Sequence, residues 1–347
     1  MAIAKSLDKS RKCRPERSEG SLSRLRDSSV AKNTLPQSDT NWTLLQPWRA
    51  RAERVVKQSL CATMILMTTN LRPSPLAGTW YPADPDSLAR SVDEYLAQAE
   101  LPELNGDVLG VIAPHAGHIY SGPVAGYAFA ALRRRTPDVV AVLSPYHNFH
   151  TIPFLTSSHS AYVTPLGEIP VAQELLDDLD DRLHHSLGVG LTRVARDREH
   201  SLEIELPFLQ RALPRPFHLL PVMVRVIDPH LAEGLGQALA DLLRGRNFLL
   251  VASTDLSHFC TQKQAERFDA EMLRQFEAFT PECLFETEEA GKGFACGLGA
   301  VASVLWAARA LGADKVQVLH HATSGEVTGD FSSVVGYGAA AILKNRG

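Results

Sequence analysis

The sequence lacks any run of about 18 consecutive apolar residues, so it does not predict a transmembrane helix. Cysteines are few: the five in its 347 residues form no CxxC pair and no regular framework, and an odd count favours a reducing compartment over a secreted disulfide scaffold. Basic residues show no excess, because the net charge is −4. We therefore expect a cytoplasmic protein with neither a membrane nor a nucleic acid as its partner.

The composition changes near residue 70. Residues 1–60 are rich in Arg, Lys and Ser and show no sustained period of 2 or 3.6, so they cannot bury enough apolar surface to offset their ordering entropy. We predict a disordered leader over residues 1–69 and one folded domain over residues 70–347. A gene start placed too far upstream would explain the leader, since Met64 and Met67 lie just before the folded part. A transit peptide is the alternative, although acidic residues in the leader argue against it.

Strands and helices alternate in the pattern from residue 71 onward, without an internal repeat. Short apolar runs that end in polar or turn residues predict strands at 107–114, 139–145, 217–226, 248–255 and 316–323. Helical periodicity predicts helices at 85–100, 171–183, 229–246, 262–279 and 297–312. This alternation predicts a single α/β domain in which helices flank a central, largely buried sheet.

Polar side chains lie at the ends of four of the predicted strands. The pairs are His115 and His118, His147 and His150, Asp255 and His258, and His320 and His321. A single histidine after a strand is usually a hydrogen-bonded loop residue. Because the carboxyl ends of parallel strands meet at one edge of a sheet, however, four such ends together predict a histidine-rich pocket that contains a carboxylate.

Two further segments carry polar residues that this pocket could use. Glu199, His200 and Ser201 precede an apolar run, and the alternative role of this segment is to cap a helix through Ser201 or Asp197. Cys296 lies just before an apolar helix, where the local positive potential favours a thiolate. A cysteine among small apolar residues is more often inert packing, so Cys296 becomes a site candidate only beside the histidines.

Seven motifs in the same order resemble the Memo family, which in bacteria and archaea is called AmmeMemoRadiSam system protein B. They are AGTWYPAD, APHAGHIYSG, LSPYHNF, EHSLEIELPFL, STDLSHF, FACGLGAV and SSVVGYGAAAI, and together they span roughly residues 73–344. The family is similar in fold to class III extradiol dioxygenases, non-haem iron enzymes that bind their metal with two histidines and a carboxylate. The resemblance therefore implies a single dioxygenase-like α/β domain.

The resemblance also implies a metal site. The positions that match the family's ligands are His115, His147 and Cys296, with the cysteine in place of the dioxygenases' carboxylate. Two imidazoles and a thiolate suit Fe(II), the metal we favour, and also Cu or Zn. Three protein ligands leave coordination positions open, as catalysis requires. Asn148 stands where many members of the family carry a second histidine, which leaves that second position without a role here.

Asp255, His200 and His258 would line the same pocket as catalytic candidates. Asp255 or His200 would orient a ligand imidazole, and His258, with an ordinary pKa of about 6.5, would act as an acid or a base. The leading hypothesis is oxidative or redox chemistry on an unknown small molecule. The family name implies radical SAM and AMMECR-type proteins as partners.

Two alternatives for the function stay open. A non-catalytic pseudo-enzyme would bind a peptide or protein segment in the pocket, with the metal site vestigial or regulatory. A zinc-dependent hydrolase would need a metal-bound water, with Asp255 or His258 as the general base. Metal content and oxygen consumption distinguish these hypotheses from the oxidative one.

Overall fold

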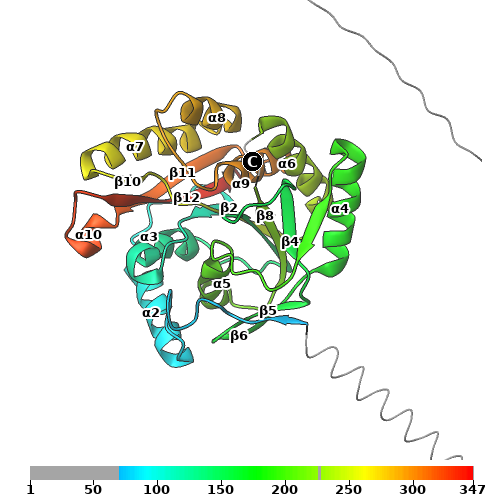
Figure 1. Ribbon diagram of the computed structural model, residues 1–347, viewed down its shortest axis with the longest axis horizontal. Helices are drawn as coiled ribbons and strands as arrows, with labels where there is room; N and C mark the ends of the chain where they lie inside the picture. The colour runs from blue at the N-terminus through cyan, green and yellow to red at the C-terminus, as the bar shows by residue number, and fades with distance from the viewer. Residues whose placement is uncertain (1–69, 226–227, 347) are drawn as a thin grey trace, which may run out of the picture. The chain divides into compact units, whose positions relative to one another are not determined.

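The computed structural model describes residues 70–225 and 228–346. Within these residues a sheet of nine strands runs through the molecule, with helices on both of its faces (Figure 1). The predicted leader, residues 1–69, and with it the prediction about the gene start, lies outside the described residues.

Four parallel strands form the middle of the sheet, in the order β2 (Asp107–Ala113), β9 (Phe248–Ser253), β3 (Val139–Pro145) and β8 (His218–Val224). Next to β2 lies the antiparallel β12 (Val334–Lys344), which also pairs with β11 (Lys315–Thr323) and β10 (His258–Cys260). Next to β8 lie β4 (Phe154–Ser157) and β7 (Leu191–Val194). A smaller sheet joins β1 (Leu71–Arg72), β5 (Ala161–Thr164) and β6 (Gly167–Pro170).

The middle strands are continuous apolar runs because helices cover them on both sides. Residues 140–143 of β3 and 249–252 of β9 are completely buried. On one face α3 (His118–Ala130) packs against β2, β11 and β12, with α2 (Pro85–Gln98) and α5 (Leu206–Ala212) beside it (Figure 1). On the other face α9 (Leu298–Ala310) packs against β2, β3, β8 and β9, and α7 (Gln262–Ala278) packs against β11 and β12.

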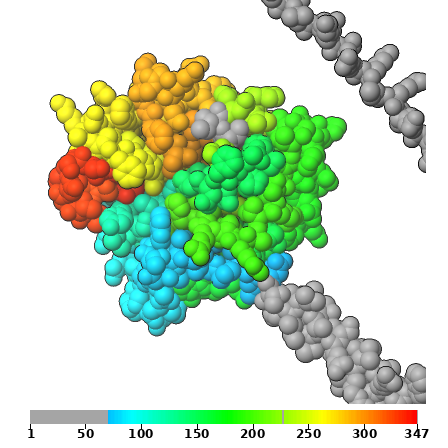
Figure 2. All heavy atoms as spheres, in the orientation of Figure 1, coloured from blue at the N-terminus to red at the C-terminus, as the bar shows by residue number. Residues whose placement is uncertain are grey.

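The remaining helices lie outside this first layer. α6 (Pro229–Leu243) and α8 (Pro281–Glu289) pack on α9, and α4 (Gln173–Leu187) packs on α6. Two short helices, η1 (Glu203–Glu205) and α10 (Gly325–Thr328), complete the described part of the chain. The segment that includes α10 lies at the edge of the molecule beside the start of α7 (Figure 2), where the N–H of Gln262 donates to the carbonyl of Phe331.

The observed elements confirm the predicted fold class, a mixed α/β domain with a central sheet flanked by helices. The five predicted helices correspond to α2, α4, α6, α7 and α9, and the five predicted strands to β2, β3, β8, β9 and β11. α2 begins as its sequence indicates: Asp84 accepts a hydrogen bond of 2.9 Å from the N–H of Ser87, and Pro85 is the first helical residue.

Helix α3 is not predicted by the sequence, because Gly122, Pro123 and Gly126 all disfavour a helix interior. Packing explains it: Tyr95 of α2 lies so close to Gly122 and Gly126 that a Cβ atom at either position would collide with it. The close approach of two helices thus outweighs weak local propensity.

In residues 70–225 and 228–346, every helix falls short of the combined length and hydropathy that a bilayer span requires.

Candidate metal centre

Three of the predicted site residues follow neighbouring strands by two positions each. His115 follows β2, Asp255 follows β9, and His147 follows β3. Because these strands are adjacent and parallel, their carboxyl ends meet at one edge of the sheet. The alternation of strands and helices therefore places the three side chains in one region of the molecule.

His200 completes a cluster of three histidines with His115 and His147. One ring nitrogen of each lies within 4.8 Å of the others. The rings of His147 and His200 are nearly parallel, at 16° with centroids 4.6 Å apart, and His115 faces both edge-on with centroids 5.4 Å away. Such a convergence of imidazoles suits a transition-metal ion.

The Glu199 carboxylate orients two of these rings. Its Oε1 lies 2.9 Å from Nδ1 of His147 and 3.2 Å from Nδ1 of His200. Burial alone would raise the pKa of Glu199, but the hydrogen bonds and charges of His147 and His200 lower it to about 2, so the group is ionised at neutral pH. When Nδ1–H of His147 donates to Glu199, Nε2 is left as the donor atom for a metal.

The imidazole of His115 is oriented by a different residue, Ser253. Its Nδ1 lies 2.8 Å from Oγ of Ser253, which itself lies 2.6 Å from Oε1 of Glu205. Burial, together with the charge of Asp255, raises the pKa of Glu205 well above its usual value, although the hydrogen bond from Ser253 opposes this. The burial of Glu205 thus favours its neutral form, and Nε2 of His115 is the ring nitrogen that does not contact Ser253.

A buried ion-pair network anchors the segment that carries Glu199. Arg72 of β1 pairs with Asp197 at 2.8 Å and with Glu203, and all three side chains are at most 2% exposed. Arg72 also donates to the backbone carbonyl of Glu199 at 2.9 Å. The first strand of the described chain thus holds the backbone on which the His147 and His200 contacts depend.

The capping role considered for Ser201 is not observed. Its Oγ donates at 2.6 Å to the carbonyl of Pro145, the last residue of β3, and η1 begins without a side-chain capping bond. Ser201 therefore ties the segment to the strand that precedes His147.

The imidazoles of His115 and His200 have the protonation state that a metal requires. Burial lowers the pKa of His115 well below its usual value, and the neighbouring His200 and His147 lower it further. Burial likewise lowers the pKa of His200 to about 4, against the opposing charge of Glu199. At neutral pH both rings are therefore uncharged and offer a lone pair without first losing a proton.

Cys296 and Asp255 lie beside His115. Sγ of Cys296 is 3.2 Å from Nε2 of His115, and Oδ2 of Asp255 is 4.0 Å from the same nitrogen. Cys296 precedes α9 as the sequence predicts, but burial raises the pKa of its thiol and Asp255 adds to this effect. A metal would have to displace the thiol proton. Burial also raises the pKa of Asp255, to about 7.

His258 lies close enough to His115 and His147 to interact electrostatically with both. The structure therefore brings His115, His147, His200, Asp255 and Cys296 together, whereas His258 lines a neighbouring cavity. The three mutually close donor atoms belong to His115, His147 and His200. His200 thus takes the place in this set that the family resemblance gives to Cys296. The ligand role that the family resemblance implies for Cys296 stays a prediction.

A cavity of about 220 Å³ opens beside the cluster and is lined by His147 and Cys296. Arg225, Glu288 and Phe294 contribute to its walls. It lies between the loop after β3 and the segment after α8, two regions that adjoin at the surface in Figure 2, in green and orange. A small molecule in this cavity would therefore lie against His147 and Cys296.

Other histidines at the predicted strand ends do not join the site. His118 is buried between the rings of Tyr81 and Phe208, with Nε2 3.1 Å from the carbonyl of Ile204, so it belongs to the core and not to the pocket wall. His320 and His321 lie within β11, inside the predicted strand 316–323, and β12 separates this strand from β2.

Sequence reasoning missed the roles of Ser253, Glu205 and Glu199. In the sequence, Ser253 is the last residue of an apolar strand and Glu205 is a charged residue in an apolar run. Nothing local indicates that both side chains are buried, as the structure shows. The only available signal was the presence of three glutamates within EHSLEIE, where burial on one side would force some of them inward.

The fold and the histidine cluster define a class: a mixed α/β protein with a candidate metal centre at the carboxyl edge of its parallel strands. The Memo-like protein family matches residues 72–341, and the chain belongs to this family. This confirms the resemblance carried by the seven motifs.

Several relatives match this chain over nearly the whole of their own length. A MEMO1 family protein of Methanopyrus kandleri is 35% identical over 286 residues, which is 80% of this chain and 99% of that protein. Those of Nitrosopumilus maritimus and Thermotoga neapolitana are 33% and 35% identical over 78% and 77% of this chain and 98% of each relative. Among solved structures, an uncharacterized protein of Escherichia coli K12 is similar with a TM-score of 0.44 and 12% identity, covering 68% of this chain and 100% of that one. That likeness is too distant to support an argument.

Proposed function

We propose that this chain binds a redox-active transition-metal ion, with Fe(II) favoured, and performs oxidative chemistry on a small molecule. The observation that carries the proposal is the convergence of ring nitrogens from His115, His147 and His200 within 4.8 Å. A cavity beside these residues gives a substrate access.

The chemistry of the donor set fits such an ion. Imidazole binds Fe, Cu and Zn, and ligating histidines usually have their other ring nitrogen held by a hydrogen-bond partner, as Glu199 holds His147 and Ser253 holds His115. Cys296 offers a soft sulfur donor next to His115. A bound ion of this kind would supply Lewis acidity and a change of oxidation state.

The surrounding side chains would bind the substrate and handle its protons. Arg225, in the wall of the cavity beside His147, can pair with an anionic group. Burial lowers the pKa of His258, so its neutral ring can accept a proton at neutral pH. Asp255 lies close enough to His115 to hold a proton at the edge of the metal site.

Metal analysis of protein purified anaerobically without added metal tests the proposal. We expect about one iron ion per chain, and oxygen consumption with at least one compound of a small-molecule screen. Both should disappear in His147→Ala and persist in His185→Ala, which removes an exposed histidine of α4. Failure of the wild type to bind iron, copper or zinc would refute the metal site. Metal binding without any turnover would favour the pseudo-enzyme instead.

Metal-dependent hydrolysis is the second candidate. Three histidines with a nearby carboxylate also form the donor set of zinc centres that activate water, and Oδ2 of Asp255 lies 4.0 Å from Nε2 of His115. Zinc has no redox chemistry, so zinc-loaded protein that cleaves esters or amides under anaerobic conditions would favour hydrolysis over oxidation.

A further inference from the structure

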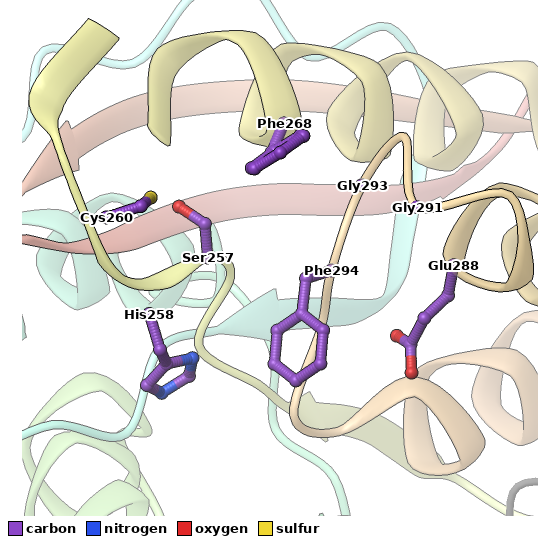
Figure 3. Close-up of a pocket in the computed structure, with 8 residues that line it drawn as sticks. All are labelled: Ser257, His258, Cys260, Phe268, Glu288, Gly291, Gly293 and Phe294. Atoms are coloured by element: carbon purple, nitrogen blue, oxygen red, sulfur yellow. The ribbon is translucent and has the colours of Figure 1, made fainter. Parts of the chain in front are cut away.

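A second cavity adjoins the metal site and differs from it in character. Its volume is about 320 Å³, and it lies between β10, the start of α7 and the segment after α8 (Figure 3). Phe294 and Glu288 line this cavity and also the one beside His147 and Cys296. The two cavities therefore share a wall, so a molecule seated in one lies next to the other.

The lining of this second cavity is mainly apolar. Phe268 of α7 and Phe294 supply aromatic surface, and two glycines of the segment after α8 leave room between them. Neither lysine nor arginine contributes to the described lining, and the acidic Glu288 does. An anion would find no countercharge here, whereas an uncharged apolar group would be sheltered from water.

Two polar atoms at this cavity have no partner. Oγ of Ser257, a residue only 2% exposed, and Nδ1 of His258 make no hydrogen bond within the described residues. Figure 3 shows both side chains on one side of the cavity, with Phe294 and Glu288 on the other. Buried polar atoms are almost always paired, so the hydroxyl of Ser257 needs a polar atom beside it, supplied by a ligand or by an ordered water.

We propose that this cavity binds the apolar end of the small molecule that reacts at the metal. That end is an uncharged group about the size of one ring, with a hydroxyl or carbonyl that bonds to Ser257. The volume of about 320 Å³ is at the lower end of the range for ligand pockets and excludes a folded peptide segment. The proposal rests on the proposed function and specifies its substrate class.

Three probes with the same ring test the proposal: benzyl alcohol, toluene and benzoate. Their binding to the full-length protein is measured by saturation-transfer NMR and by titration. Benzyl alcohol should bind most tightly, toluene roughly 2- to 10-fold more weakly because it lacks one hydrogen bond, and benzoate should not compete. If benzoate displaces bound benzyl alcohol more effectively than toluene does, this cavity accepts an anion and the proposal is wrong.

Two variants locate the probes. Ser257→Ala should remove the difference between benzyl alcohol and toluene, because only the alcohol uses Oγ, and it should leave toluene binding unchanged. Phe294→Ala should weaken both. Phe331→Ala is the matched control, since it removes a ring that is 51% exposed, compared with 41% for Phe294, and lines neither cavity. An undiminished preference for benzyl alcohol in Ser257→Ala would overturn the assignment of the hydroxyl.

A final measurement relates the cavity to the metal. In protein loaded with Co²⁺, the NMR signals of bound benzyl alcohol should broaden, and with diamagnetic Zn²⁺ they should not. If the wild type binds neither ion, the proposed function fails, while the probe titrations still report on the cavity. If both ions bind but the probe is excluded or shows no broadening, the proposed function stands and the substrate class proposed for this cavity is wrong.

Discussion

Oε1 of Glu199 lies 2.9 Å from Nδ1 of His147, and this contact joins the loop after β3 to the segment before η1. The same oxygen lies 3.2 Å from Nδ1 of His200. One carboxylate thus determines which nitrogen of each ring faces the candidate metal position, and the energetics of metal binding should depend on it.

Glu199→Gln should weaken metal binding by about 10- to 100-fold, the usual effect of losing a partner that orients a ligand. The amide removes the negative charge and places an NH2 group among backbone and imidazole N–H donors. Competitive titration with Zn²⁺ measures the change. Glu174→Gln, an exposed substitution on α4, should bind as the wild type does, and identical affinities for all three proteins would contradict a positioning role.

The third ligand can be identified by comparing His200→Ala with Cys296→Ser. Because His200 belongs to the set of mutually close donors, its removal should reduce affinity by more than the roughly 100-fold limit expected of an orienting residue. Cys296→Ser nearly preserves shape and should have the smaller effect. A loss in Cys296→Ser that equals the loss in His147→Ala would establish the sulfur as a ligand, as the family resemblance implies.

Arg72→Met should destabilise the fold by about 3–5 kcal/mol, because it leaves the buried carboxylates of Asp197 and Glu203 without their countercharge. Denaturant unfolding followed by circular dichroism measures this. The matched control is Arg211→Met. Arg211 and its partner Asp93 are both half-exposed, so this variant should lower the free energy of unfolding by only about 0–1 kcal/mol. Equal costs for the two variants would show that the Arg72 network does not anchor the segment.

Glu205 should make the stability depend on pH in a predictable direction. Its folded-state pKa is raised above the ordinary value of 4.5, so above that pH the folded state binds more protons than the unfolded state. The free energy of unfolding should therefore fall as pH rises, by up to about 1.4 kcal/mol per pH unit, until the folded-state pKa is reached.

Glu205→Gln keeps the shape and removes this titration. Above about pH 5, its free energy of unfolding should fall less steeply with pH than that of the wild type. The exposed Glu174→Gln should instead follow the wild-type curve. Parallel curves for the wild type and Glu205→Gln would mean that Glu205 is ionised in the fold.

The sequence by itself determined the main helices and the middle strands of the sheet, together with three residues of the site. Helical periodicity and continuous apolar runs are local properties, so five helices and five strands could be predicted from them. The position of His115, Asp255 and His147 also followed from a local feature, because each ends a buried strand and parallel strands deliver their carboxyl ends to the same edge.

Only the tertiary structure decided which other side chains complete that edge. His118 has the same sequence context as His115 but turns into the core beside Phe208, whereas His200 joins the cluster from a segment held by Arg72, more than a hundred residues away. The partners Ser253 and Glu205 meet His115 through strand order and helix packing. Contacts between residues so distant in the chain leave no periodic signal in it, since each depends on how the complete sheet is assembled and covered.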